Sequence, residues 1–248
     1  MSTAFTPRIT LATTRRILAQ LRHDPRTIAL LVLVPSLLMV LLRYVFDSPG
    51  LFDRVGPQLI AVFPLVIMFI VTSVATLRER TGGTLERLMA TPTGKLDFLL
   101  GYALAFGALA VVQVGAVLAV SLTWLGLDLA GSVGSLFLVA VLDALLGMAL
   151  GLLASAFART EFQAVQFMPA FVLPQLLLCG LFVPRDQMAS WLHAASVVMP
   201  MSYAVEAMQQ LTRYSDVTGT LVRDVLVIAG CTLLALGLGA ATLRRRTA

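Results

Sequence analysis

The stretch RERTGGTLERLMATP, residues 78–92, is a charged island between two long apolar runs. Its glycine pair at 82–83 is typical of a helix end, and Thr84 is a good N-cap for a new helix. Pro92 prevents that helix from continuing, because proline lacks a backbone donor and clashes with the preceding turn. The island therefore predicts a short, water-exposed helix between two membrane spans.

The short helix that follows the glycine pair has one apolar face. Leu85, Leu88 and Met89 are spaced at i, i+3 and i+4, so they lie on the same side of the helix. Charged side chains flank this side, and a small apolar face surrounded by charge indicates a docking surface for a soluble partner protein. The candidate docking residues are Thr84, Leu85, Glu86, Arg87, Leu88 and Met89.

The composition of the 248-residue chain is that of a membrane protein. It is 58% hydrophobic and 12% charged, and its mean hydropathy is +0.91, outside the usual range of soluble domains. In so apolar a chain the net charge of +5 indicates membrane orientation, and we expect no nucleic-acid partner. No polar linker divides the sequence, so we expect one integral membrane domain over residues 1–248.

Six apolar runs approach the roughly 20 residues that a helix needs to cross a bilayer. The sequence therefore predicts an all-α membrane protein with six transmembrane helices. Residues 1–26 precede the first span, residues 78–96 form the docking loop, and residues 184–213 form an outer segment. The expected spans are residues 27–42, 57–77, 98–125, 134–157, 165–183 and 225–243, so that spans one and two fall within 27–77 and spans three to five within 97–183.

The distribution of basic residues predicts the orientation. With six spans both termini share one side, and 13 of the 18 Lys and Arg residues fall there, including those of the docking loop. The positive-inside rule places that side in the cytoplasm. We expect a multi-pass protein of the inner (plasma) membrane, inserted through its own spans, since residues 1–26 lack the apolar core of a signal peptide.

The first 26 residues predict an amphipathic helix that lies in the membrane interface. Pro7 suits the first helical turn, and Asp24-Pro25 is a stop signal. Three arginines recur every seven residues, so they form one stripe that faces lipid phosphates. The alternative is a disordered basic tail. The arginines of this elbow helix are Arg8, Arg15, Arg16 and Arg22, and its apolar residues are Leu11, Ile17, Leu18 and Leu21.

Residues 184–213 are expected outside the cell, yet much of the segment is apolar. Residues 189–199 are too short to span and Pro200 interrupts the run, which favours two half-helices that dip into the outer leaflet. Trp191 and Tyr203 suit an interfacial depth, and Glu206 begins a more polar return.

Asp143 lies near the middle of the fourth predicted span, where a carboxylate costs a few kcal/mol. Two interpretations stay open: a polar element of a translocation route or proton-sensitive site, and a helix-packing residue. Gln113 and Gln175 also lie in spans, and such amides either link helices or line a pathway.

The sequence contains no motif for catalysis, metal binding or nucleotide binding. His23 and His193 are isolated, and both cysteines, Cys179 and Cys231, fall in apolar runs as small hydrophobic residues. No G-x-x-x-x-G-K-[ST] loop occurs, so we expect this chain to bind no cofactor. If ATP drives it, the nucleotide site is on another subunit.

Two motifs resemble those of ABC transporter type-2 permeases. ERTGGTLERLMATP, residues 79–92, is similar to that family's E-R-E-x-G-T-L-E-x-L-x-x-T-P, with Thr81 in place of an acidic residue. VPRDQMASWL…MPMSYAVEA, within residues 183–207, is similar to P-x-x-x-x-P-x-W-L…P-x-x-Y-x-x-E-A, with Met188-Ala189 in place of Leu-Pro. The subgroup that it resembles most is the drug-resistance exporters of the daunorubicin-exporter kind.

The resemblance implies two permease subunits, identical or paralogous, on two copies of a cytoplasmic ATPase that holds ATP and Mg. It implies that Leu85, Glu86, Leu88 and Met89 dock on the ATPase. It also implies that residues 184–213, with Trp191, Pro200, Tyr203 and Glu206, close an outer gate.

The function expected from these observations is export of a hydrophobic or amphipathic small molecule. Export of a lipid or lipid-linked polysaccharide is the alternative. A proton-driven secondary transporter with Asp143 as relay would need more intramembrane ionisable residues and an internal repeat. A membrane-embedded enzyme would need a convergent catalytic set at one membrane face, which the sequence does not show.

Overall fold

The computed structural model describes residues 6–82 and 95–242, and these are helical apart from short connections. The expected all-α class is confirmed, and the described residues contain no strand. The docking residues 84–89 lie outside the described residues. The helices are α1 (Pro7–Arg22), α2 (Pro25–Phe46), α3 (Pro49–Thr81), α5 (Lys95–Thr123), α6 (Val133–Ala154), α7 (Glu161–Leu178), the 3-10 turn η1 (Arg185–Gln187), α8 (Ser190–Val198), α9 (Pro200–Arg213) and α10 (Gly219–Ala241).

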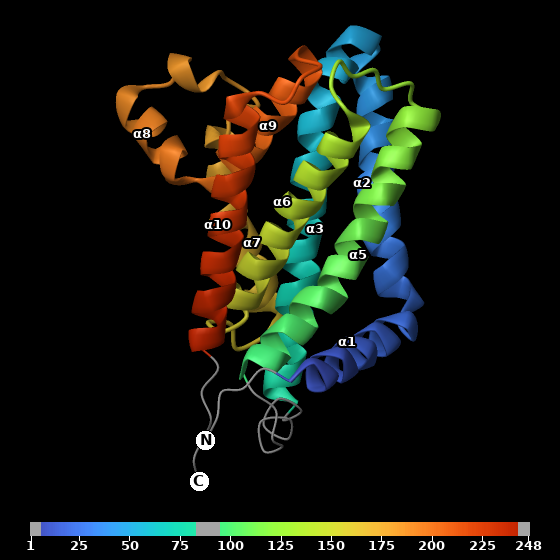
Figure 1. Cartoon of the computed structure of the whole chain (residues 1–248), viewed down its shortest axis with the longest axis vertical. Helices are drawn as coiled ribbons and strands as arrows, with labels where there is room; N and C mark the ends of the chain where they lie inside the picture. The colour runs from blue at the N-terminus through green and yellow to red at the C-terminus, as the bar shows by residue number, and fades with distance from the viewer. Residues whose placement is uncertain (1–5, 83–94, 243–248) are drawn as a thin grey trace.

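The long helices form an upright bundle, and α1 crosses its lower end (Figure 1). The helices α8 and α9 lie at the upper end, beside the start of α10. The final turns of α3 and α10 and the first turn of α5 gather at the lower end with α1. The described ends of the chain and both flanks of residues 83–94 thus share one end of the molecule.

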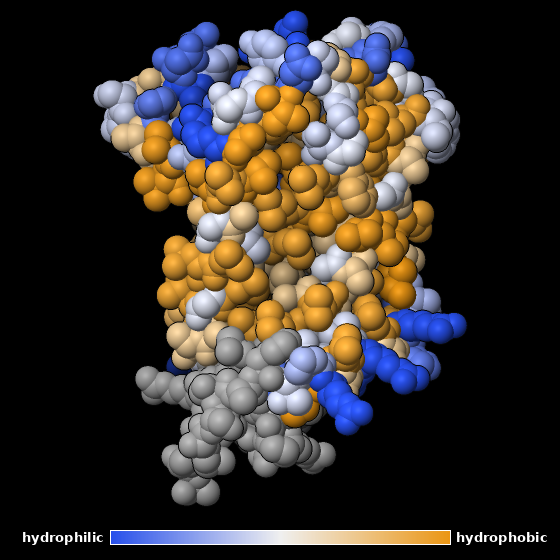
Figure 2. All heavy atoms as spheres, viewed as in Figure 1, coloured by the Kyte–Doolittle hydropathy of each residue, from blue (hydrophilic) through white to orange (hydrophobic). Residues whose placement is uncertain are grey.

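An apolar surface covers the middle of the bundle, and hydrophilic side chains gather at its ends (Figure 2). The central helices are α3 and α6, in which 61% of the apolar window is buried, against 17% in α2 and 28% in α10. Large apolar side chains such as Leu37 and Leu233 are more than half exposed. Such a surface requires lipid or a membrane partner around it.

Five helices are long and apolar enough to cross a membrane: α2, α3, α5, α6 and α10. They match five of the six predicted spans. The remaining prediction, residues 165–183, corresponds to α7, which is not among the five because two prolines and three glutamines dilute its apolar residues. Its 18 residues measure about 27 Å, close to the thickness of a bilayer core. The six-span count remains a prediction.

The helix α3 begins eight residues earlier than the sequence predicted, at Pro49 instead of position 57. Pro49 stands at the favoured first helical position after Ser48, which explains the earlier start. The added turns do not extend into empty space, because Asp53 accepts a 3.0 Å hydrogen bond from the backbone N–H of Asp128. The polar extension therefore holds the loop between α5 and α6.

The contact between α3 and α6 depends on two small residues. Gly147 and Gly151 are four residues apart on α6, and a Cβ atom on either would overlap the backbone carbonyl of Leu65 or Phe69, respectively. Small residues at this spacing let two membrane helices approach closely. The centre of the bundle is thus a close backbone contact, with Asp143 one turn above Gly147.

Candidate functional site

The candidate docking segment connects α3 to α5, so its attachment points are described even though residues 83–94 are not. One attachment point is the last turn of α3, and the other is the first turn of α5. Both lie at the end of the bundle that α1 crosses (Figure 1). Residues 83–94 are thus joined covalently to the bundle through these two turns.

Three consecutive residues before the docking segment each contact a different helix. Arg78 binds Glu161 of α7 through two hydrogen bonds of 2.7 and 2.9 Å. Glu79 pairs with Arg16 of α1 at 3.3 Å. The third residue, Arg80, reaches Thr242 after α10 at 3.4 Å. Consecutive helical residues point about 100° apart, so this turn is braced on three sides.

The start of α5 is braced against α1 by a buried carboxylate. Asp97 accepts hydrogen bonds from the Thr6 backbone N–H at 2.8 Å and from the Thr10 hydroxyl at 3.1 Å. Thr14 donates to the Gly101 carbonyl at 3.2 Å. A Cβ atom on Gly101 would lie 2.7 Å from the Thr13 side chain, so α1 and α5 touch closely here. Both attachment points of the docking segment therefore contact α1.

The predicted helix before the first span is present as α1, with Pro7 in its first turn. Its arginine stripe of Arg8, Arg15 and Arg22 is exposed, whereas Arg16, beside the stripe, binds Glu79. The expected apolar face of Leu11, Ile17, Leu18 and Leu21 stays a prediction, since Ile17 is buried and Leu11 is 62% exposed to the membrane side or solvent. Thr10 and Thr13 are also buried, and the Thr10 hydroxyl donates to Asp97 of α5 at 3.1 Å.

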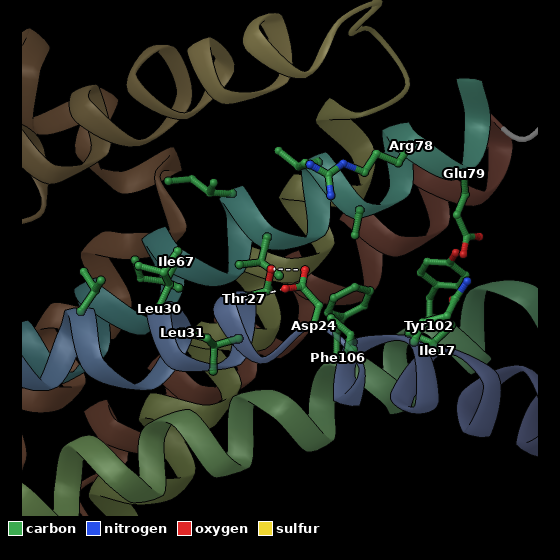
Figure 3. A pocket seen from close by; sticks show the side chains of 17 residues that line it. Ile17, Asp24, Thr27, Leu30, Leu31, Ile67, Arg78, Glu79, Tyr102 and Phe106 are labelled. Carbon is green, nitrogen blue, oxygen red and sulfur yellow. Dashed lines mark hydrogen bonds between the residues drawn. The ribbon is translucent and has the colours of Figure 1, made fainter. Parts of the chain in front are cut away.

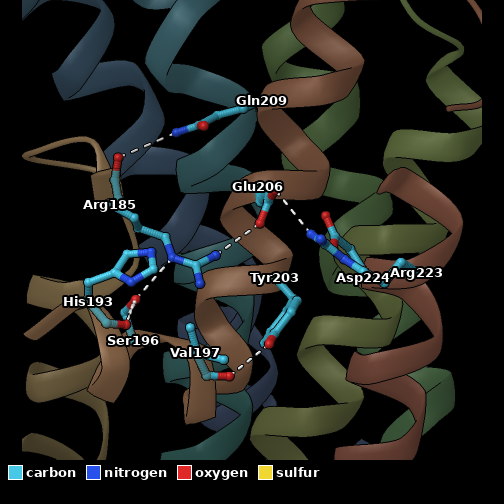
Figure 4. A network of polar contacts seen from close by, with 10 residues as sticks. Arg185, His193, Ser196, Val197, Tyr203, Glu206, Gln209, Arg223 and Asp224 are labelled. Atoms are coloured by element: carbon cyan, nitrogen blue, oxygen red, sulfur yellow. Dashed lines mark hydrogen bonds and ion pairs between the residues drawn. The ribbon is translucent and has the colours of Figure 1, made fainter. Parts of the chain in front are cut away.

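The opposite end of the bundle holds a chain of alternating charges (Figure 4). Arg185 donates to Ser196 at 3.0 Å and pairs with Glu206 at 2.9 Å. Glu206 also pairs with Arg223 of α10 at 3.0 Å, and Arg223 pairs with Asp224 at 2.7 Å. The chain of charges ties the segment before α8 to α9 and then to α10.

Of the residues predicted for an outer gate, Tyr203 and Glu206 belong to this network, whereas Pro200 and Trp191 do not. Tyr203 donates to the Val197 carbonyl at 2.7 Å, and the guanidinium groups of Arg185 and Arg223 lie 5.7 and 5.8 Å from its ring centre. Pro200 begins α9, as its position predicted. Trp191 is 71% exposed on α8 and stands apart from the network.

Sequence reasoning missed the roles of Arg185, Arg223 and Asp224. Arg185 and Arg223 entered only the count of basic residues that predicts the orientation, and Asp224 was not considered. Adjacent opposite charges inside an apolar run, as at 223–224, are a signal that could have found two of them.

The polar residues predicted within the spans face the interior of the bundle. Asp143 and Gln113 are fully buried, and neither side chain has a hydrogen-bond partner among the described residues. Gln175 does link helices: it donates to the Phe171 carbonyl at 3.0 Å and accepts from the Met201 N–H at 3.4 Å. Buried polar groups normally have partners, so both interpretations of these side chains, as pathway elements and as helix-packing residues, stay open.

The described residues contain no group of three or more His, Cys, Asp or Glu side chains placed to hold a metal ion. His23 bonds only its own helix, at the Ala19 carbonyl, and the two cysteines are free thiols. The contacts that the structure shows are ion pairs at the two ends of the bundle and apolar packing in its core.

Comparison with known proteins agrees with this architecture. The model of the ABC-2 type transporter family matches residues 8–212. The Escherichia coli protein named probable multidrug ABC transporter permease YbhS is 28% identical over 206 residues, which cover 82% of this chain and 55% of that protein. A second such permease of E. coli, YbhR, is 30% identical over 157 residues, covering 63% and 43% of the two chains.

A eukaryotic relative, ABC transporter G family member 20 of Dictyostelium discoideum, is 26% identical over 169 residues, covering 67% of this chain and 23% of that protein. The chain thus spans about half the length, or less, of the curated relatives that it matches. The family match covers most of the chain, from α1 to the end of α9. Together with the all-helical bundle, it shows that this chain is a membrane protein of the ABC-2 type transporter family.

Proposed function

We propose that this chain is the permease subunit of an ATP-driven exporter. In this proposal residues 84–89 dock on a separate cytoplasmic ATPase, which binds ATP and Mg and is present in two copies. The apolar face of Leu85, Leu88 and Met89 supports the docking role. The relatives named as multidrug permeases support export.

The observation that carries the proposal is the bracing of the last turn of α3. Arg78, Glu79 and Arg80 connect the turn before the docking segment to α7, α1 and the end of α10. A displacement of the docking segment would therefore act on three helices at once. A transport subunit driven from the cytoplasm needs such a connection, because ATP is hydrolysed outside the membrane.

In the proposed arrangement α7 serves as the fifth of six spans, and both termini face the cytoplasm from the inner membrane. The exposed arginine stripe of α1 then contacts lipid phosphates. A second permease copy, or a paralogue, covers part of the exposed apolar surface. The charge chain from Arg185 to Asp224 would hold the outer segment closed between transport events, and it would open for the release of substrate.

The proposed substrate is a hydrophobic or amphipathic small molecule, because most buried side chains of the described bundle are apolar. A lipid or lipid-linked polysaccharide is the second candidate. Asp143 and Gln113, which are buried and have no side-chain hydrogen-bond partner within the described ranges, are the proposed polar elements of the pathway. We do not assign a proton relay, since no described basic residue pairs with Asp143.

The test is capture of the ATPase by the tagged permease after co-expression, followed by ATP-driven export. Leu88→Asp is expected to abolish capture and export, because an unpaired charge at an apolar contact is costly. Leu88→Met keeps the apolar face and is the matched control, with capture near that of wild type. Equal capture and export by the Asp and Met variants would refute the docking assignment.

A further inference from the structure

A pocket of about 540 Å³ lies where α1, α2, α3 and α5 meet, at the end of the bundle that α1 crosses (Figure 3). It belongs neither to the docking segment nor to the charge chain at the opposite end. Its volume falls within the usual range for sites that bind small molecules.

The walls of the pocket are apolar and open toward the lipid. Leu31 and Phe106 are buried in its walls, and Ile67 and Val74 of α3 form another side. Leu30 lines the pocket while being 61% exposed. Because Leu30 stands on the lipid-facing side of α2, an acyl chain can enter between α2 and α3 without crossing a polar surface.

The polar residues of the pocket gather at the end of it nearest α1, where a lipid headgroup would lie. Asp24, Arg78 and Glu79 line this end. Arg78 is held by Glu161, and Glu79 is held by Arg16. Asp24 forms no ion pair among the described residues, although Arg78, which Glu161 already holds, also acts electrostatically on its carboxylate.

Asp24 is ionised and oriented. The Thr27 hydroxyl and backbone N–H donate to its carboxylate at 2.7 and 3.2 Å. These hydrogen bonds, the hydroxyl first, lower the pKa of Asp24 below its ordinary value. A carboxylate accepts about four hydrogen bonds, so acceptor sites remain for a ligand.

A second polar group in the pocket lacks a partner. Tyr102 lines the pocket and is 1% exposed, and its hydroxyl has no hydrogen-bond partner among the described residues. Its ring stands at the same end of the pocket as Glu79 (Figure 3). A buried hydroxyl that is left without a partner costs free energy, which a ligand with donors and acceptors would recover.

Exposed arginines stand on both sides of Asp24. Arg22 and Arg26 flank it in the sequence and do not line the pocket. A phosphate could therefore contact these guanidinium groups while an ammonium group, two carbons beyond the phosphate ester oxygen, contacts Asp24. One headgroup that carries both charges fits this arrangement better than a purely anionic one.

We propose that this pocket binds one phospholipid with a primary ammonium headgroup, a phosphatidylethanolamine from the cytoplasmic leaflet. One acyl chain lies between α2 and α3, the ammonium group donates to Asp24, and the phosphate faces the arginines beside it. The bound lipid would fix the angle between α1 and α2. The proposal concerns lipid binding by the permease alone, so it succeeds or fails independently of ATPase docking.

The test is native mass spectrometry of the delipidated, full-length permease titrated with single lipids of matched acyl chains. The probes are phosphatidylethanolamine, phosphatidylcholine, which lacks N–H donors, and phosphatidylglycerol, which lacks the ammonium group. Wild type is expected to bind phosphatidylethanolamine about tenfold more tightly than it binds phosphatidylcholine or phosphatidylglycerol. A tenfold ratio of Kd values corresponds to about 1.4 kcal/mol of binding free energy. Asp24→Asn is expected to remove this preference and to leave the weaker binding unchanged.

A second pair of variants separates the pocket from the rest of the apolar surface. Val74→Trp fills the groove and is expected to lower binding of all three lipids. The matched control is Leu233→Trp on the lipid-facing side of α10, where the side chain is 69% exposed, and it should bind as wild type does. Retention of the headgroup preference in Asp24→Asn, preference for phosphatidylglycerol in wild type, or equal binding by both tryptophan variants would overturn the proposal.

Discussion

Two glycines of α6 set its distance from α3, and replacing either with alanine is expected to destabilise the fold. The added methyl group of Gly147→Ala would overlap the Leu65 carbonyl, and that of Gly151→Ala the Phe69 carbonyl. Neither obstacle is a flexible side chain, so the two helices must separate. Separation would weaken the most buried contact of the bundle, since α3 and α6 are its central helices.

The magnitude follows from two opposing terms. Overpacking costs about 1–3 kcal/mol, and a backbone obstacle places this case near 3 kcal/mol. Replacing a glycine in a helix interior with alanine stabilises the helix by about 1 kcal/mol. The net loss is about 2 kcal/mol for each variant, which in a chain of this size lowers Tm by about 4–8 °C.

The assay is thermal unfolding of the detergent-solubilised permease, with the fraction remaining monodisperse measured after heating. The matched controls are Gly230→Ala and Gly237→Ala on α10, where an added Cβ would meet nothing within 4 Å. These controls are expected to keep or slightly raise Tm. If Gly147→Ala and Gly151→Ala unfolded at the same temperature as the controls, the close α3–α6 contact would be refuted.

Two further predictions concern topology and gating. A cysteine at Ser132, in the loop before α6, should react with a membrane-impermeant maleimide in intact cells, whereas one at Thr93 should react only after lysis; the reverse pattern would invert the orientation. Cysteines at the exposed Ser190 of α8, cross-linked between two permease copies, should reduce ATP-driven export, and efficient cross-linking with full export would contradict a gating role. Ser196 is unsuitable for this test, because it is buried and bonded to Arg185.

Local signals in the sequence predicted the helices and many of their boundaries. Pro7 begins α1 and Pro200 separates α8 from α9, because proline fixes both positions through its own backbone geometry. The apolar runs predicted five spans that the structure contains. Such features depend on a few neighbouring residues, so one sequence is enough to find them.

Contacts between distant segments were not predictable in the same way. The pairing of Arg16 with Glu79 joins residues 63 positions apart, and nothing in the local sequence identifies Glu79 as the partner of Arg16. The burial of Thr10 of α1 was not predicted, because its partner Asp97 lies 87 positions away on α5. Hydrophobicity alone cannot predict that a polar side chain is buried when its partner lies on another helix.

The helix α3 is held by contacts at both of its ends, so a small rotation at one end is transmitted to the other. Its 33 residues measure about 50 Å, well beyond the roughly 30 Å of hydrocarbon that it crosses. Asp53 holds a loop near its first turn, and Glu79 holds α1 near its last. If the helix pivots as one piece at the last turn, a tilt of about 5° moves its far end by about 4 Å over that length. A small tilt at the end of the bundle that α1 crosses would thus be large enough to part hydrogen bonds at the opposite end.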